Sequence, residues 1–111
     1  MDKATEDILK EITGVIIKAV NPLKIILFGS YVRGNAASDS DLDLLIVEEH
    51  PFAPSRSRTK EIGNIHRLLK HIRIPVDILV YSNQEFYKWM DAKNHVIAHA
   101  AREGRVLYER T

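Results

Sequence analysis

The sequence contains no cysteine, and this absence removes several kinds of chemistry at once. Disulfide bonds, thiolate zinc sites and a cysteine nucleophile are excluded, so any bound metal must be held by oxygen or imidazole ligands. The chain also lacks an excess of charge of either sign, because sixteen Lys and Arg face fifteen Asp and Glu. The formal charge of +1 provides no broad basic field, which argues against nucleic acid as the main partner.

No apolar run is long enough to cross a membrane, and the charged N-terminus does not look like a secretion signal. We therefore expect a cytoplasmic protein without membrane attachment. With 111 residues, 45% hydrophobic and 28% charged, the chain fits one small globular domain over residues 1–111. A domain of this size builds one core, so we expect any second substrate-binding domain to come from another chain.

Helices and short buried strands are expected to alternate along the sequence. Apolar spacing and breakers such as Asn21-Pro22 predict helices over about 3–20, 62–72, from the capping box at 82–85 onward, and 94–103. The same signals predict strands at 24–28, 42–47, 76–81 and 106–108, with the first two side by side. Residues 48–57, with two prolines, are expected to form a mobile loop that serves substrate entry, and Arg56, Arg58 and Lys60 are expected to be solvated.

The most informative stretch combines a Gly-Ser turn with a pair of aspartates. Gly29-Ser30 follows the first expected strand, and Asp41-Leu42-Asp43 opens the second after ten residues. Gly29 lets the backbone approach a phosphate closely, and Ser30 adds a hydroxyl and an N–H where a short helix begins. Arg33 is placed for a charge-assisted contact with the same anion. The turn therefore predicts a triphosphate site.

Three aspartates are the candidate metal ligands. Asp41 and Asp43 are two residues apart, so on a strand they project from one face about 7 Å apart. Mg²⁺ is the simplest compensation for their repulsion, with phosphate oxygens as further ligands. Asp77 is the only acid in the third expected strand, where burial without a partner would cost on the order of several kcal/mol. Beside the second strand it would complete a trio that holds a second ion and activates an attacking hydroxyl.

Simpler interpretations exist for each feature. A lone Gly-Ser turn or Asp-x-Asp pair is usually structural, but the two joined in this order favour a functional site. For Asp77 the alternative is a strand-end aspartate that accepts hydrogen bonds from backbone N–H groups. His95 and His99 could share a helix face but lack a third ligand, so we expect ordinary helix residues. Phe86 and Trp89 are expected in the core or at a partner contact.

The set formed by Gly29-Ser30, ten residues, Asp41-x-Asp43 and Asp77 resembles the minimal nucleotidyltransferase group of the DNA polymerase β-like superfamily, including MntA-like antitoxins of HEPN/MNT systems. The expected helix and strands and the ending at 103–108 are also similar to that group. The resemblance implies an α+β fold with a mixed sheet flanked by helices. It further implies Mg²⁺-dependent transfer of a nucleoside monophosphate, with the aspartates as metal and catalytic carboxylates and Gly29-Ser30 on the triphosphate.

Small proteins of this group often act as antitoxins beside a HEPN-domain toxin, and some transfer AMP from ATP to a tyrosine of that toxin. The resemblance therefore implies ATP as substrate, up to two Mg²⁺ ions and a HEPN-domain partner as acceptor. Two alternatives stay open: a non-catalytic antitoxin that covers the toxin, and nucleotidyl transfer to a small hydroxylated molecule, against which the small size weighs. The oligomeric state is also open, a homo-oligomer included.

Overall fold

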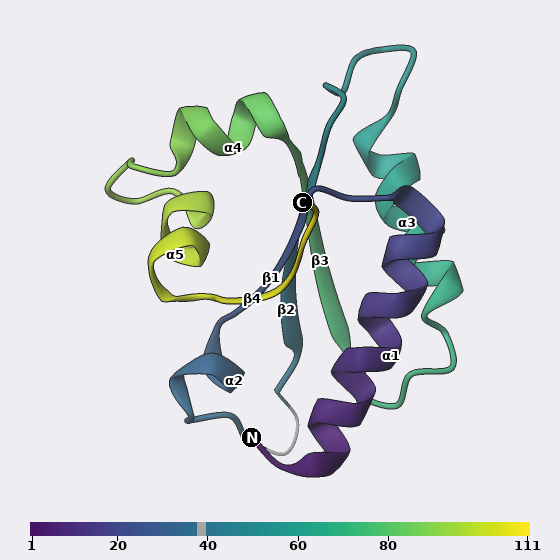
Figure 1. The fold of residues 1–111 in the computed structure, drawn as a ribbon, viewed down its shortest axis with the longest axis vertical. Helices are drawn as coiled ribbons and strands as arrows, with labels where there is room; N and C mark the ends of the chain where they lie inside the picture. Colours follow the sequence, from purple (N-terminus) through teal and green to yellow (C-terminus); the bar gives the residue numbers. More distant parts are fainter. Residues whose placement is uncertain (38–39) are drawn as a thin grey trace.

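A computed structural model describes residues 1–37 and 40–111 of the chain (Figure 1). Its elements follow the predicted order: α1 (Lys3–Val20), β1 (Lys24–Phe28), α2 (Ser30–Arg33), β2 (Leu42–Glu48), α3 (Arg58–Leu68), β3 (Val76–Ser82), α4 (Asn83–Trp89), α5 (Val96–Glu103) and β4 (Arg105–Glu109). No helix in the described residues combines the length and the apolar character that a membrane crossing requires.

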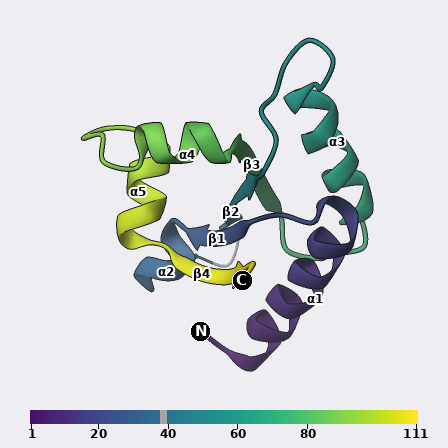
Figure 2. The same ribbon diagram turned by 45° about the horizontal axis from the view of Figure 1, so that its top comes forward.

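The strands form one mixed sheet in the order β3-β2-β1-β4. The inner pair, β1 and β2, is antiparallel, β4 adds to the free side of β1 in the antiparallel sense, and β3 lies parallel to β2. Helices α1 and α3 lie on one side of the sheet and α4 and α5 on the other, as both ribbon views show (Figure 2). The predicted fold class and the predicted neighbours of β2 are confirmed.

Alternation along β2 assigns its side chains to the two sides of the sheet. Leu42, Leu44 and Ile46 pack with residues of α1 and α3, whereas Leu45 and Val47 pack with residues of α4 and α5. All five are almost fully buried. Burial of one such side chain stabilises the fold by about 1.5–3 kcal/mol, and a one-residue slip would move all of them to the wrong side. The hydrophobic pattern therefore fixes the register of the strand.

Helix boundaries agree with the predicted caps. The α1 helix ends at Asn21, whose left-handed backbone (φ 47°) turns the chain before the following proline. At the start of α4, Ser82 and Glu85 form the predicted capping box, in which each accepts a hydrogen bond from the other's backbone N–H. Such caps contribute about 1 kcal/mol each. The α3 helix is shifted from its prediction, because Ser57 accepts a hydrogen bond from the Lys60 N–H and so starts the helix at residue 58.

The loop after β2 differs from its prediction. The Arg56 guanidinium lies 2.7 Å from the Glu48 carboxylate and stacks over the Phe52 ring at 4.3 Å. Arg58 bonds Glu85 at 2.6 Å and also donates to the Val80 carbonyl. The expectation that Arg56 and Arg58 are solvated is therefore wrong, whereas Lys60 is exposed as expected. The mobility of the loop stays a prediction. The loop also follows the opposite end of β2 from the aspartates, so a role in substrate entry there is not supported.

Glu48, the last residue of β2, is a buried carboxyl with an unusual environment. It is 3% exposed, and its Oε2 atom has no hydrogen-bond partner among the described residues. Burial, followed by the hydrogen bond and like charge of Glu61 on α3, raises the pKa of Glu48 to about 8, although Arg56 acts in the opposite direction. The Glu48 carboxyl therefore tends to keep its proton near neutral pH.

This pair predicts how stability changes with pH. The pKa of Glu48 rises from an ordinary 4.5 to about 8 in the folded protein. The folded state thus binds more protons between these values, and the free energy of unfolding falls as pH rises through them. We expect Glu48→Gln, which stays neutral, to show a smaller drop in urea midpoint from about pH 5 to about pH 8.5 than wild type. Glu49→Gln, at the exposed neighbouring residue, is the control, and its urea midpoint should change with pH as in wild type. The same change of midpoint with pH in all three proteins would refute the explanation.

Candidate active site

Asp43 and Asp77 are brought together by the parallel pairing of β2 and β3. Each is the second residue of its strand, and the two are register partners. Neighbouring strands lie about 4.8 Å apart, so the carboxylates start from adjacent backbone positions. By alternation with Leu45 and Leu79, both point to the side of the sheet that α4 and α5 cover. The predicted placement of the third strand beside the second is confirmed.

The electrostatics of Asp43 show that the charges of the two other aspartates act on it. Burial raises the pKa of Asp43, and the nearby charges of Asp77 and Asp41 raise it further, while Arg33 acts in the opposite direction. Like charges in a partly desolvated site disfavour ionisation of each other. This end of the sheet is therefore a place where a positive charge from a ligand or ion would be stabilised.

Two of the aspartates are more exposed than the sequence indicated. Asp77 is exposed at the start of β3, so the burial expected for it is wrong and the cost of that burial does not arise. Asp41 is also exposed and lies one residue before β2 begins. Asp43 alone is partly buried. The site therefore opens toward solvent on the side of Asp41 and Asp77.

The glycine turn lies directly against Asp43. Phe28, the last residue of β1, is the register partner of Asp43, and Gly29 follows with a left-handed φ of 84°. A Cβ atom at Gly29 would overlap Oδ2 of Asp43 and lie 3.1 Å from its Cγ. Ser30 then opens α2, and no side chain caps the first N–H groups of this helix. The turn thus presents backbone donors beside a carboxylate.

A pocket of about 470 Å³ connects these elements with α5, and its size is typical of small-ligand sites. It brings together three of the predicted residues, Gly29, Arg33 and Asp43, whereas Ser30, Asp41 and Asp77 are not among its lining residues. The remaining lining residues are Phe28, Asn94, Val96, His99 and Glu103.

The contribution of α5 was missed by sequence reasoning. His99 and Glu103 are four residues apart and share a helix face. This spacing was the one feature of the sequence that could have indicated a polar helix surface at the site. The expectation that His95 and His99 are ordinary helix residues places His99 in α5 correctly, but His95 precedes the helix as its N-cap. Its ring accepts a hydrogen bond from the Ile97 N–H at 3.1 Å and stacks on Trp89 with 4.7 Å between ring centroids. His95 therefore has a structural role, and His99 faces the pocket.

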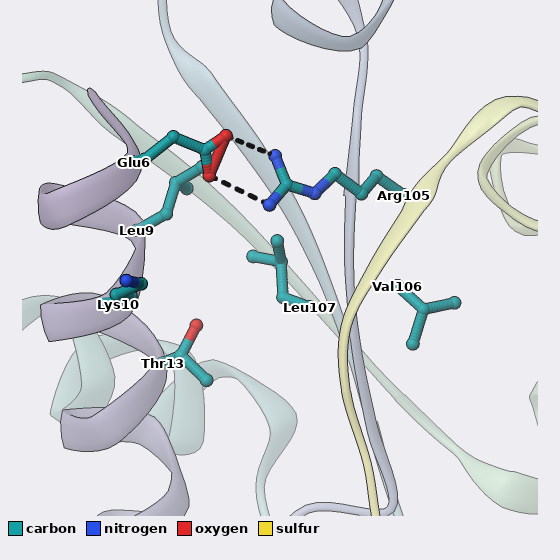
Figure 3. A pocket seen from close by; sticks show the side chains of 7 residues that line it. All are labelled: Glu6, Leu9, Lys10, Thr13, Arg105, Val106 and Leu107. Carbon is teal, nitrogen blue, oxygen red and sulfur yellow. Dashed lines mark hydrogen bonds and ion pairs between the residues drawn. The ribbon is translucent and has the colours of Figure 1, made fainter. Parts of the chain in front are cut away.

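Another pocket, of about 280 Å³, lies between α1 and β4 (Figure 3). Glu6 and Arg105 close one side of it with a two-pronged ion pair at 2.7 and 2.8 Å. The Arg105 guanidinium is therefore already paired with a carboxylate of the fold. The pocket also lies on the side of the sheet that α1 covers, away from Asp43. The candidate site is therefore the pocket beside Asp43.

The aspartates fit Mg²⁺ in their donor chemistry. Over residues 1–37 and 40–111, no group of three or more Asp, Glu, His or Cys side chains converges closely enough to hold a metal ion. The three-carboxylate centre therefore stays a prediction. Mg²⁺ is usually held by one or two carboxylates, with waters and substrate phosphates as its other ligands. The adjacent Asp43 and Asp77, together with the repulsion that raises the pKa of Asp43, meet that requirement.

The sheet, the glycine turn and the neighbouring carboxylates define a class of enzyme that acts on nucleoside triphosphates. Residues 5–102 match the family model described as a nucleotidyltransferase domain, which is most of the chain. The chain therefore belongs to the nucleotidyltransferase domain family, as the resemblance of its motifs implied.

Individual relatives support this assignment. A candidate protein adenylyltransferase of Methanocaldococcus jannaschii is 36% identical over 85 residues, which cover 77% of each chain. A candidate nucleotidyltransferase from Sulfolobus solfataricus has a similar crystal structure, with a TM-score of 0.63 and 21% identity over 94% of this chain and 79% of that one. A crystal structure of a toxin–antitoxin with AMP-PNP is also similar, with a TM-score of 0.62 and 17% identity over 92% of this chain and 73% of that one. These two structures show the shared fold.

The contact between Gly29 and Asp43 predicts different outcomes for two glycine substitutions. Gly29 and Gly34 both have left-handed φ, 84° and 79°, so alanine at either position should destabilise the fold by about 1–2 kcal/mol. Only at Gly29 does the new Cβ displace Asp43, since nothing lies within 4 Å of a Cβ at Gly34. We expect Gly29→Ala to bind Mg²⁺-ATP at least about tenfold more weakly in calorimetry. Gly34→Ala should bind like wild type, and equal binding by both variants would contradict the role of the contact.

Proposed function

We propose that this nucleotidyltransferase is a Mg²⁺-dependent protein adenylyltransferase that transfers AMP from ATP to a hydroxyl, a tyrosine, of a partner protein. The partner is a HEPN-domain toxin, which the transfer neutralises. The observation that carries the proposal is the in-register pairing of Asp43 with Asp77 next to the glycine turn at Gly29.

The residues of the site have distinct tasks in this reaction. Gly29, Ser30 and Arg33 hold the triphosphate through backbone N–H groups, a hydroxyl and a guanidinium. Asp41, Asp43 and Asp77 are the residues that would hold magnesium, which supplies positive charge for the attacking and leaving oxygens when bound. Asp43, the most buried of the three, is fixed against the sheet and would anchor the ion beside the glycine turn.

The bonds change in one displacement. The acceptor oxygen attacks the α-phosphorus, and the bond from that phosphorus to the bridging oxygen of the β-phosphate breaks, so pyrophosphate leaves. The acceptor proton passes to the carboxylate of Asp77, which is exposed and therefore within reach of a partner side chain. The product is an AMP ester of the acceptor hydroxyl.

Two relatives support AMP and a protein acceptor. The Methanocaldococcus jannaschii relative is named for protein adenylylation, and the toxin–antitoxin structure holds AMP-PNP, an ATP analogue. The resemblance of the motifs to antitoxins of HEPN/MNT systems supports the HEPN-domain partner and the tyrosine.

Asp43→Asn tests the catalytic role. The change keeps the size of the side chain but removes the charge, so transfer of labelled AMP to the HEPN-domain partner should fall by about a hundredfold or more. Its urea midpoint should stay at or above that of wild type, because the neighbouring carboxylates no longer repel a charge there. Asp91→Asn, an exposed aspartate after α4, is the matched control and should transfer AMP normally. Normal transfer by Asp43→Asn would refute the proposal.

Mass spectrometry of the co-expressed partner tests the acceptor. We expect a mass increase of one or more AMP units, located on a tyrosine, that is absent with Asp43→Asn. Neutralisation of an unmodified toxin at full potency by the Asp41→Asn, Asp43→Asn double variant would instead support occlusion. Turnover with a soluble hydroxylated acceptor and no partner would support small-molecule transfer.

A further inference from the structure

The pocket beside Asp43 has two walls of different chemistry. The wall from the glycine turn, β2 and α2 carries the Arg33 guanidinium beside the Asp43 carboxylate. The opposite wall comes from α5 and the residue two before it. Its lining residues are Asn94, Val96, His99 and Glu103, which include one carboxylate and no Lys or Arg.

The two walls suit the two halves of a nucleoside triphosphate. Phosphates are attracted to the Arg33 guanidinium and to the magnesium ion that Asp43 would hold, whereas Glu103 on the other wall has no cationic side chain beside it among the lining residues and repels them. An amide such as Asn94 can both donate to and accept from the edge of a base, and Val96 supplies apolar surface. A carboxylate also accepts hydrogen bonds from ribose hydroxyls. Charge therefore places the phosphates on the α2 wall and the nucleoside on the α5 wall.

The polar side chains of the α5 wall are available for a ligand. Asn94, His99 and Glu103 are exposed, and none of them forms a side-chain hydrogen bond or ion pair with another residue of the described chain. The helix is held in place by other residues, since Ile97 and Ala100 are buried against the sheet. A substitution on the wall should therefore change the ligand contact and leave the position of the helix intact.

The backbone after α5 fixes the distance of the wall from the glycine turn. A Cβ at Gly104 would overlap the Ala100 carbonyl and the Ile26 side chain and lie 3.0 Å from the Leu27 carbonyl. The end of α5 is thus packed directly onto β1, the strand that leads into Gly29. Both walls are built on the same strand, so their separation is set by the sheet.

We infer that Asn94, Val96, His99 and Glu103 form the nucleoside subsite, in which Asn94 and His99 select the base and ribose of the substrate. The inference rests on the proposed function, because it takes a nucleoside triphosphate as the ligand of this pocket. It assigns the selection of the nucleoside to the α5 wall, which is separate from the three aspartates.

Binding of two probes separates the two halves of the pocket. The probes are a non-hydrolysable ATP analogue and inorganic tripolyphosphate, each with Mg²⁺, titrated by calorimetry into wild type and variants. Asn94→Ala and His99→Ala should each bind the ATP analogue about tenfold more weakly and tripolyphosphate with unchanged affinity. Arg33→Ala should weaken both probes. Lys93→Ala and His66→Ala, exposed residues outside the pocket, are the matched controls and should bind both probes normally.

The outcomes distinguish this inference from the proposed function. If the Asn94 and His99 variants weaken both probes equally, or neither, the subsite assignment is overturned while the proposed function stands. If wild type binds neither probe, both are overturned. His99→Gln serves as a second variant at that position and should give the same pattern as His99→Ala. A cooperative urea transition with the wild-type midpoint shows that each variant is folded.

Discussion

The candidate site depends on the register of β2 between its two neighbours. Phe28 of β1, Asp43 of β2 and Asp77 of β3 are aligned across three adjacent strands. A slip of one residue would turn Asp43 into the core under α1 and α3 and turn Leu44 out of it. Burial of an unpaired carboxylate costs on the order of several kcal/mol, and the displaced leucines would have to repack against helices on the other side of the sheet. The apolar pattern that stabilises the sheet therefore also holds the carboxylates in place.

The glycine turn depends on that register as well. Because Phe28 is paired with Asp43, the next residue of β1 must pass the Asp43 carboxylate at close range. A side chain at Gly29 would occupy the position of Oδ2, and the left-handed backbone there also disfavours other residues. One missing Cβ thus allows the backbone donors at the start of α2 to lie next to the carboxylates.

Local patterns in the sequence predicted the elements and the capping box at Ser82, because each depends on residues close in the chain. The pairing of β3 with β2 joins distant residues, and it was predicted from the order and spacing of the aspartates. The interactions that were missed connect distant residues. Arg58 contacts a carbonyl 22 residues away and a carboxylate 27 residues away. Local composition does not show such distant partners, and Arg58 was therefore assigned to solvent. His99 looks like any exposed helix residue until Gly104 packs α5 onto β1 and brings it to the pocket. The three aspartates were recognised by order and spacing, but the exposure of Asp77 depends on where β3 begins relative to β2.

The two ends of β2 show why one buried carboxyl indicates a ligand and another does not. Glu48 and Asp43 both have raised pKa values because of burial and neighbouring carboxylates. At Glu48 the compensation comes from within the fold, since the Arg56 guanidinium forms an ion pair with its carboxylate at 2.7 Å. At Asp43 the neighbours are two exposed aspartates, and Arg33 forms no ion pair with any described residue. Arg33 lowers the pKa of Asp43 without forming an ion pair with it, so the remaining repulsion is left for a bound cation to offset. A raised pKa alone is therefore a weak marker of function, whereas a raised pKa without an ion pair inside the fold, beside an open pocket, is a more specific one.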